Sequence, residues 1–198
     1  MHGSPLTRSA AARSSSATDA LDWRLLLTNL FVGVAAGLLS AAMRLDLHLP
    51  GHRAVFWLTA VVAGRLVARH RFGATASASA AACMSLALGR NLAGGWMFLP
   101  LVSAAGALID TLAAFIERKA VPLWLVVPLM GLGGLGANLL CSIKRLLVPP
   151  GAIRAVFGVP FPLGNMVSYA VFGLLAGLIG ATIAVAATKR RRPSPKAD

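Results

Sequence analysis

Residues 25–43 read LLLTNLFVGVAAGLLSAAM and contain no charged side chain. A helix needs about 20 mostly apolar residues to cross the hydrocarbon core of a bilayer, and this run has nineteen. Ser40-Ala41-Ala42 resembles a signal-peptide cleavage site, but the run is longer than the apolar core of a typical signal peptide. We therefore predict that this stretch forms the first membrane-spanning helix.

The composition of the whole chain agrees with a membrane protein. Of the 198 residues, 57% are hydrophobic and 13% are charged, and the mean hydropathy is +0.75. Soluble domains carry about 25% charged residues, and a soluble fold of this size could not bury so much apolar surface. We predict a single integral membrane domain of the all-α class.

Five further apolar runs complete a predicted bundle of six transmembrane helices. They cover residues 54–67, 74–88, 96–116, 122–143 and 167–187. The bundle occupies residues 23–188 and follows a serine- and alanine-rich tail, 1–22, which we expect to be disordered and cytoplasmic. A basic cytoplasmic tail, 189–198, ends the chain. Residues 152–159, between two proline-rich turns, are expected to form a short interfacial helix or a re-entrant segment.

The basic residues predict how the helices are oriented. Nineteen Lys and Arg against six Asp and Glu give a net charge of +13, which in a soluble protein would suggest a nucleic-acid partner. Here the basic residues lie mostly at the ends of apolar runs, where they anchor helices in a lipid bilayer, so we predict no nucleic-acid binding. With a cytoplasmic N-terminus, thirteen basic residues fall inside and six outside. We therefore expect both termini in the cytoplasm and the bundle in the cell membrane.

This orientation places three polar connectors on the outer side, at residues 44–53, 89–95 and 148–166. Together with the neighbouring helix ends, they suggest an outward-facing site for a small molecule. Its predicted ligand-binding residues are Asp46, His48, His52, Arg53, Trp57, Asn91, Asn138, Asn165 and Tyr169. Simpler interpretations stay open: the first connector as a solvated loop, Trp57 as an interfacial anchor, and Asn138 bonded to a backbone carbonyl.

The sequence carries no signature of catalysis, a metal or another cofactor. Asp46, His48 and His52 are metal-ligand types, but the Pro-Gly pair between the histidines prevents a helical spacing, so we predict no metal site. The two cysteines lie in apolar runs without metal-ligand spacing, and neither H-E-x-x-H nor G-x-S-x-G is present. We predict that the protein is not an enzyme.

Residues 131–136 read GLGGLG and match a dinucleotide-binding pattern. That function requires a strand before the glycines and a soluble βαβ unit around them. Here the pattern lies inside a predicted membrane helix, so we interpret the glycines as a close helix crossing or a locally unwound segment.

Two charged residues lie inside predicted spans. Arg65 is about eleven residues into the second span and Asp110 about fourteen into the fourth, roughly 16 and 21 Å of helical rise. Both spans run inward, so the two charges have similar depth. An unpaired charge there costs a few kcal/mol, and we predict an intramembrane ion pair between them.

The first span also has a face of small residues, formed by Gly33, Ala36, Gly37, Ser40 and Ala41. Such a face lets another helix approach closely. Ordinary packing within the bundle is one interpretation of it, and contact with a partner protein is another.

Six spans in under 200 residues, two cytoplasmic termini, this small-residue face and long outer loops resemble the substrate-binding S components of energy-coupling-factor transporters. The resemblance lies in the architecture of about residues 24–190. It implies capture of a vitamin-like solute from outside, with uptake energised by a transmembrane coupling protein and paired ATPases. It also implies that the small-residue face meets the coupling protein. The chain has no Walker motif of its own. The alternative is a membrane scaffold or accessory subunit without a substrate.

Overall fold

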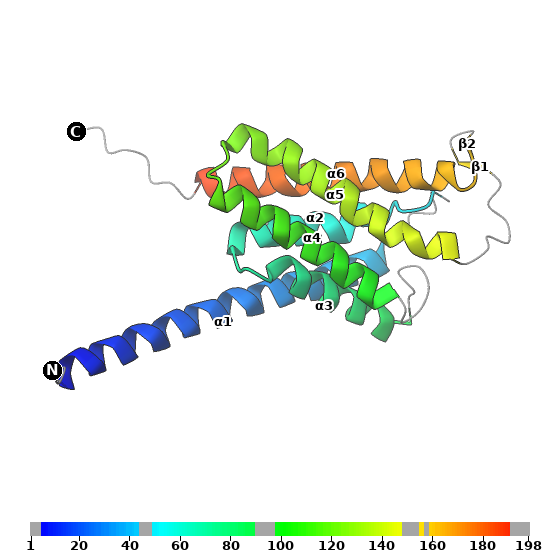
Figure 1. The fold of residues 1–198 in the computed structure, drawn as a ribbon. Helices are drawn as coiled ribbons and strands as arrows, with labels where there is room; N and C mark the ends of the chain where they lie inside the picture. Colours follow the sequence, from blue (N-terminus) through cyan, green and yellow to red (C-terminus); the bar gives the residue numbers. More distant parts are fainter. Residues whose placement is uncertain (1–4, 44–48, 90–97, 148–154, 157–158, 191–198) are drawn as a thin grey trace.

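The computed structural model describes the backbone of residues 5–43, 49–89, 98–147, 155–156 and 159–190. Within these ranges the chain forms six helices and one short hairpin (Figure 1). The helices are α1 (Pro5–Ala42), α2 (Ala54–Ala68), α3 (Gly73–Ala87), α4 (Phe98–Arg118), α5 (Leu123–Leu147) and α6 (Leu163–Arg190). The strands are β1 (Ala155–Val156) and β2 (Val159–Pro160). The predicted all-α class is confirmed, with one helix at each apolar run.

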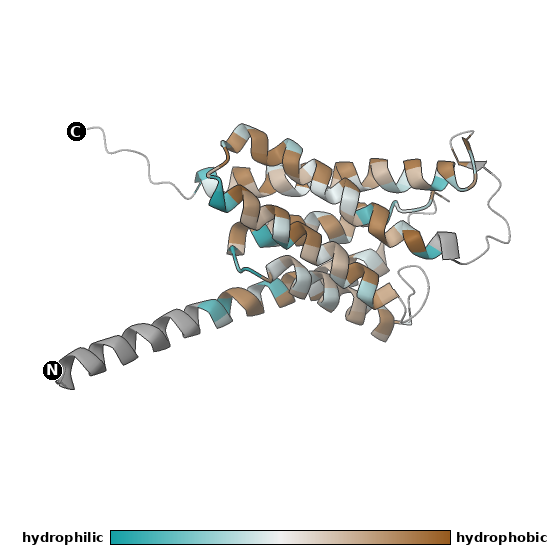
Figure 2. Ribbon diagram, viewed as in Figure 1, coloured by the Kyte–Doolittle hydropathy of each residue, from teal (hydrophilic) through white to brown (hydrophobic). Residues whose placement is uncertain are grey.

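The helices have the length and polarity of a membrane bundle. The Asp22–Ala42 part of α1, most of α5, and the whole of α4 and α6 are long and apolar enough to cross a membrane. α2 and α3 have 15 residues each, a rise of about 22 Å against a hydrocarbon core of about 30 Å. Hydrophobic residues cover the helices, and hydrophilic ones gather near helix ends (Figure 2). The chain is a multi-pass integral membrane protein.

The six helices close into a ring in the order α1–α3–α4–α5–α6–α2, and α2 returns to α1. α2 also contacts α3, α4 and α5, so it lies toward the middle of the bundle. Its buried side chains include Trp57, Leu58, Val61 and Arg65. This inner position lets a short helix carry a charged residue without exposing it to lipid.

The start of α1 and the end of α6 lie toward the same end of the bundle, and the hairpin lies at the opposite end (Figure 1). α1 begins at Pro5, so residues 5–22, predicted to be disordered, are helical and project away from the other helices. The sequence has no glycine or further proline until Gly33. A helix that is already nucleated by packing can therefore propagate outward through this alanine-rich stretch.

The connector before α6 also differs from its prediction. Residues 155–156 and 159–160 pair as antiparallel strands, with Val156 opposite Val159, and no helix forms in the described part of 152–159. Proline disfavours the helical conformation of the residue before it, and Val159 and Phe161 both precede prolines. Gly164, at the start of α6, packs against the carbonyl groups of Val156 and Val159.

The glycine-rich run of α5 forms a close helix crossing. α5 is continuous through residues 131–136, which excludes a locally unwound segment there. A Cβ atom added to Gly134 would collide with the carbonyl oxygen of Gly173, and one added to Gly177 would collide with that of Met130. The backbones of α5 and α6 therefore touch, as small residues in membrane helices permit.

Candidate functional site

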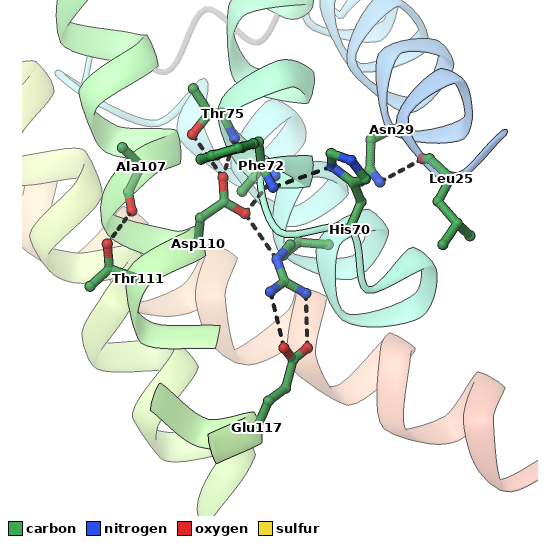
Figure 3. A network of polar contacts seen from close by, with 11 residues as sticks. Leu25, Asn29, His70, Phe72, Thr75, Ala107, Asp110, Thr111 and Glu117 are labelled. Carbon is green, nitrogen blue, oxygen red and sulfur yellow. Dashed lines mark hydrogen bonds and ion pairs between the residues drawn. The ribbon is translucent and has the colours of Figure 1, made fainter. Parts of the chain in front are cut away.

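Arg65 binds two carboxylates inside the bundle (Figure 3). Its Nε donates to Oδ1 of Asp110 at 2.9 Å, so the predicted ion pair is present in the structure. Its Nη1 and Nη2 donate to Oε1 and Oε2 of Glu117 at 2.9 and 3.3 Å. The arginine side chain is 1% exposed. Glu117 was not predicted, although it lies seven residues after Asp110, on the same face of α4.

Asp110 also caps a neighbouring helix. Its Oδ1 accepts from the backbone N–H of Ala74 at 3.0 Å, and its Oδ2 accepts from the N–H and the hydroxyl of Thr75 at 2.8 and 2.7 Å. These amides belong to the first turn of α3, and Phe72, the N-cap residue, provides no side-chain bond. A carboxylate there satisfies free N–H groups and interacts favourably with the helix dipole. One acid therefore joins α2, α3 and α4.

Two glycines allow the start of α3 to lie close to α4 and to α1. A Cβ atom on Gly106, one turn before Asp110, would lie 2.7 Å from the carbonyl oxygen of Ala74. A Cβ atom on Gly73 would lie 2.8 Å from the side-chain amide of Asn29 on α1. The turn between α2 and α3 is fixed by His70, whose Nδ1 accepts from the N–H of Phe72 at 3.2 Å. The start of α3 is thus held from both sides.

The two acids differ in their access to solvent. The side chain of Asp110 is 7% exposed and that of Glu117 is 42% exposed. Glu117 lines a cavity of about 270 Å³ between the ends of α2, α4 and α6 and the start of α5, together with Arg69 and Thr188. Asp110 accepts four hydrogen bonds, which indicates a structural role. Glu117 is the more exposed acid of the network and the one that lines this cavity.

At the opposite end, the end of the first connector packs on α6. The hydroxyl of Ser168 donates to the carbonyl of Pro50 at 2.6 Å, and Gly51 lies against the ring of Tyr169. The ring of His52 meets that of Phe172 edge-on, with centroids 6.3 Å apart. Of the predicted ligand-binding residues, His52 therefore packs on α6 and Tyr169 packs on the end of the first connector.

Asn138 of α5 lies at the same place but needs no ligand. Its Nδ2 donates to the carbonyl oxygen of Tyr169 at 2.8 Å, which is the backbone partner that the sequence left open. Trp57 is buried within the bundle, so its interpretation as an interfacial anchor is wrong. Arg53 is partly buried next to the start of α2.

Asn165, in the first turn of α6, has a different environment. It is 2% exposed, and neither Nδ2 nor Oδ1 has a hydrogen-bond partner among the described residues. A buried polar group is normally bonded, and each exception requires an explanation.

The remaining predicted ligand-binding residues lie outside the described residues; they are Asp46, His48 and Asn91. Elsewhere in the chain as described, no three His, Cys, Asp or Glu side chains form a group that could hold a metal ion.

The assignment of the small-residue face of α1 to a partner protein is wrong. Gly33 packs against the carbonyl of Ser77, and a Cβ atom on Gly37 would lie 2.7 Å from the carbonyl oxygen of Ala81. Ala36 and Ser40 are buried, and Ala41 is partly buried. The alanine- and serine-rich α3 has a matching small surface, so it covers this face within the same chain.

Comparison with known proteins leaves the family of this chain open. No protein-family model matches it, and neither a curated protein nor a solved structure gives a match.

Proposed function

We propose that this membrane protein binds a small polar solute at its outer end, as the capturing subunit of an uptake system energised by separate proteins. The observation that carries the proposal is the buried amide of Asn165, which has no hydrogen-bond partner among the residues that the structure describes. Leaving such a group unbonded costs about 1–3 kcal/mol. Hydrogen bonds from a polar ligand would remove this cost, since a side-chain amide can both donate and accept.

The surroundings of Asn165 support this interpretation. One turn further along α6, Ser168 holds the end of the first connector and Tyr169 holds Asn138 of α5. The first turns of α6 are therefore fixed by contacts on two sides, so Asn165 lies on a rigid element, as a binding group should. Asp46 and His48 lie a few residues before Pro50, the residue of the first connector that Ser168 holds. They are the natural additional ligand groups.

The scaffold alternative has less support. It depends on open faces of small residues that would hold a partner helix. The face of α1 is covered by α3, at Gly33 and Gly37, and the face of α6 is covered by α5, at Gly173 and Gly177. A coupling protein would therefore have to bind another surface of this chain.

Replacing Asn165 by leucine tests the proposal, because leucine has a similar volume and neither amide group. Native mass spectrometry of the wild-type protein, purified without added ligand, should detect a small molecule that Asn165→Leu lacks. The matched control is Thr182→Val on the same helix, where an exposed hydroxyl bonds to the carbonyl of Leu178. This control should retain the molecule.

A thermal melt separates binding from a structural role. Without ligand, Asn165→Leu should raise the melting temperature by about 2–12 °C, since about 1–3 kcal/mol of unpaired burial is removed. A lower melting temperature would show that the amide is bonded in the folded protein. That result would contradict the proposal. The proposal would also be contradicted if Asn165→Leu kept the copurified molecule, or if the wild-type protein copurified with no small molecule.

A further inference from the structure

A second hollow, separate from the cavity lined by Glu117, lies between the start of α3 and the second half of α4. It is a groove of about 560 Å³. Three basic side chains, Arg71, Arg118 and Lys119, and two aromatic ones, Phe72 and Phe115, contribute to its lining. The groove is at the same end of the bundle as Lys189 and Arg190, which end α6, and this end is the predicted cytoplasmic one.

The groove changes from basic to apolar along its length. Ala107 also lines it, eleven residues before Arg118 on α4 and therefore about 16 Å deeper into the membrane. Phe72 and Phe115 are 54% and 50% exposed, so they form apolar walls that face out of the bundle. The guanidinium carbon of Arg71 lies 4.8 Å from the ring centroid of Phe72, over its face. A charged mouth therefore leads to a mostly apolar floor, to which Thr75 and Thr111 also contribute.

The positive charge of the mouth is not neutralised by any acid within the described ranges. Asp110 contributes to the lining, but its oxygens are bonded to Arg65 and to the first turn of α3. Within the described ranges, Arg71, Arg118 and Lys119 form no salt bridge. A ligand entering the groove would meet three basic groups and one acid that is already paired.

We propose that this groove binds an anionic phospholipid of the cytoplasmic leaflet, with the phosphate at the three basic side chains and an acyl chain along the apolar floor. Basic pockets between transmembrane helices bind such headgroups, and arginine and lysine are the common partners of phosphate. The lipid would bridge α4 and the start of α3. α3 is too short to span the bilayer, so this contact would reinforce the capping bond from Asp110.

The site is tested by lipid titration of the purified protein in detergent, followed by native mass spectrometry. Dioleoyl phosphatidylglycerol should bind, and dioleoyl phosphatidylcholine should bind at least tenfold more weakly. Arg118→Ala with Lys119→Ala should weaken phosphatidylglycerol binding on the order of thirtyfold, from the typical contribution of two basic groups near an anionic lipid. The matched control, Lys189→Ala with Arg190→Ala, removes the same charge at the same end and should change binding less than threefold.

Two further arms distinguish a lipid site from a charged surface. Ala107→Trp fills the apolar floor and leaves the basic residues in place, so it should weaken lipid binding at least tenfold. Glycerol 3-phosphate carries the phosphate without acyl chains and should not compete at millimolar concentration. Equal losses in the two double variants, full binding by Ala107→Trp, or competition by glycerol 3-phosphate would each overturn the proposal. Monodisperse elution of every variant in size-exclusion chromatography confirms that folded proteins are compared.

Discussion

Removing the carboxylate of Asp110 should destabilise the protein far more than removing that of Glu117, although both acids bind Arg65. Asp110 is buried and also bonds the first turn of α3. Glu117 is 42% exposed and bonds the arginine alone among the described residues. Water can replace the contact of Glu117 but not the contacts of Asp110.

The contacts give an order of magnitude for each change. Removing one partner of a buried ion pair costs about 3–5 kcal/mol, and losing a helix cap costs about 0.5–2 kcal/mol. Because Arg65 keeps Glu117, we expect a total of about 3–5 kcal/mol for Asp110→Asn. This corresponds to roughly 6–20 °C in melting temperature for a chain of this size. Partly exposed ion pairs contribute about 0–1 kcal/mol, so Glu117→Gln should shift the melting temperature by less than about 4 °C.

A double-mutant cycle in detergent, followed by tryptophan fluorescence during heating, tests the coupling. Arg65→Ala with Asp110→Ala should cost less than the sum of the single changes, by about 0.5–3 kcal/mol. The double variant should still be less stable than the wild type, because the amides of Ala74 and Thr75 lose their acceptor. Additive effects, or an equal loss from Glu117→Gln and Asp110→Asn, would refute the reasoning.

Three further predictions concern packing and orientation. Gly134→Val should strongly lower stability because its side chain would enter the α6 backbone, whereas Gly136→Ala meets one leucine methyl group at 3.2 Å and should be tolerated; equal melting temperatures would contradict the close crossing. Gly37→Leu should destabilise the isolated chain, since this glycine contacts the α3 backbone; an unchanged melting temperature would show that the contact is unimportant. In a background without the two native cysteines, Leu88→Cys should react with an impermeant reagent from outside and Lys189→Cys only after permeabilisation, and labelling of both in intact cells would contradict the proposed topology.

The helices could be predicted from the sequence because hydropathy alone marks them. Each apolar run coincides with a helix whose ends lie within a few residues of the prediction, apart from the start of α1. The hairpin at residues 155–160 could not be found in this way, since two strands of two residues each have no periodic pattern. The small-residue face of α1 was recognised, but its partner was not. Small residues predict a close crossing without specifying the helix that makes it, and here that helix is α3.

The candidate sites, like the helices, could be predicted where a local sequence pattern marks them, and could not be predicted where they depend on a tertiary contact. Arg65 and Asp110 could be paired from their depth in the membrane, because an unpaired charge at that depth is costly. Glu117 follows the apolar run, where an acid normally faces water, so its sequence position concealed its contact with Arg65. The bond from Asp110 to α3 depends on the close approach of Gly106 to Ala74, which no local pattern indicates.

Asn165 illustrates what the structure adds to a sequence-based site. In the sequence it was one of nine polar or aromatic candidates near the outer end, and the sequence drew attention to Asn138 instead, because that amide lies inside a predicted span and needs a partner. The structure separates the two asparagines, because Asn138 bonds to the carbonyl of Tyr169 and Asn165 has no partner in the described part of the chain. The first amide therefore contributes to holding α5 against α6. The second is buried without a partner in that part of the chain, so it is the residue at which the proposed binding should be tested first.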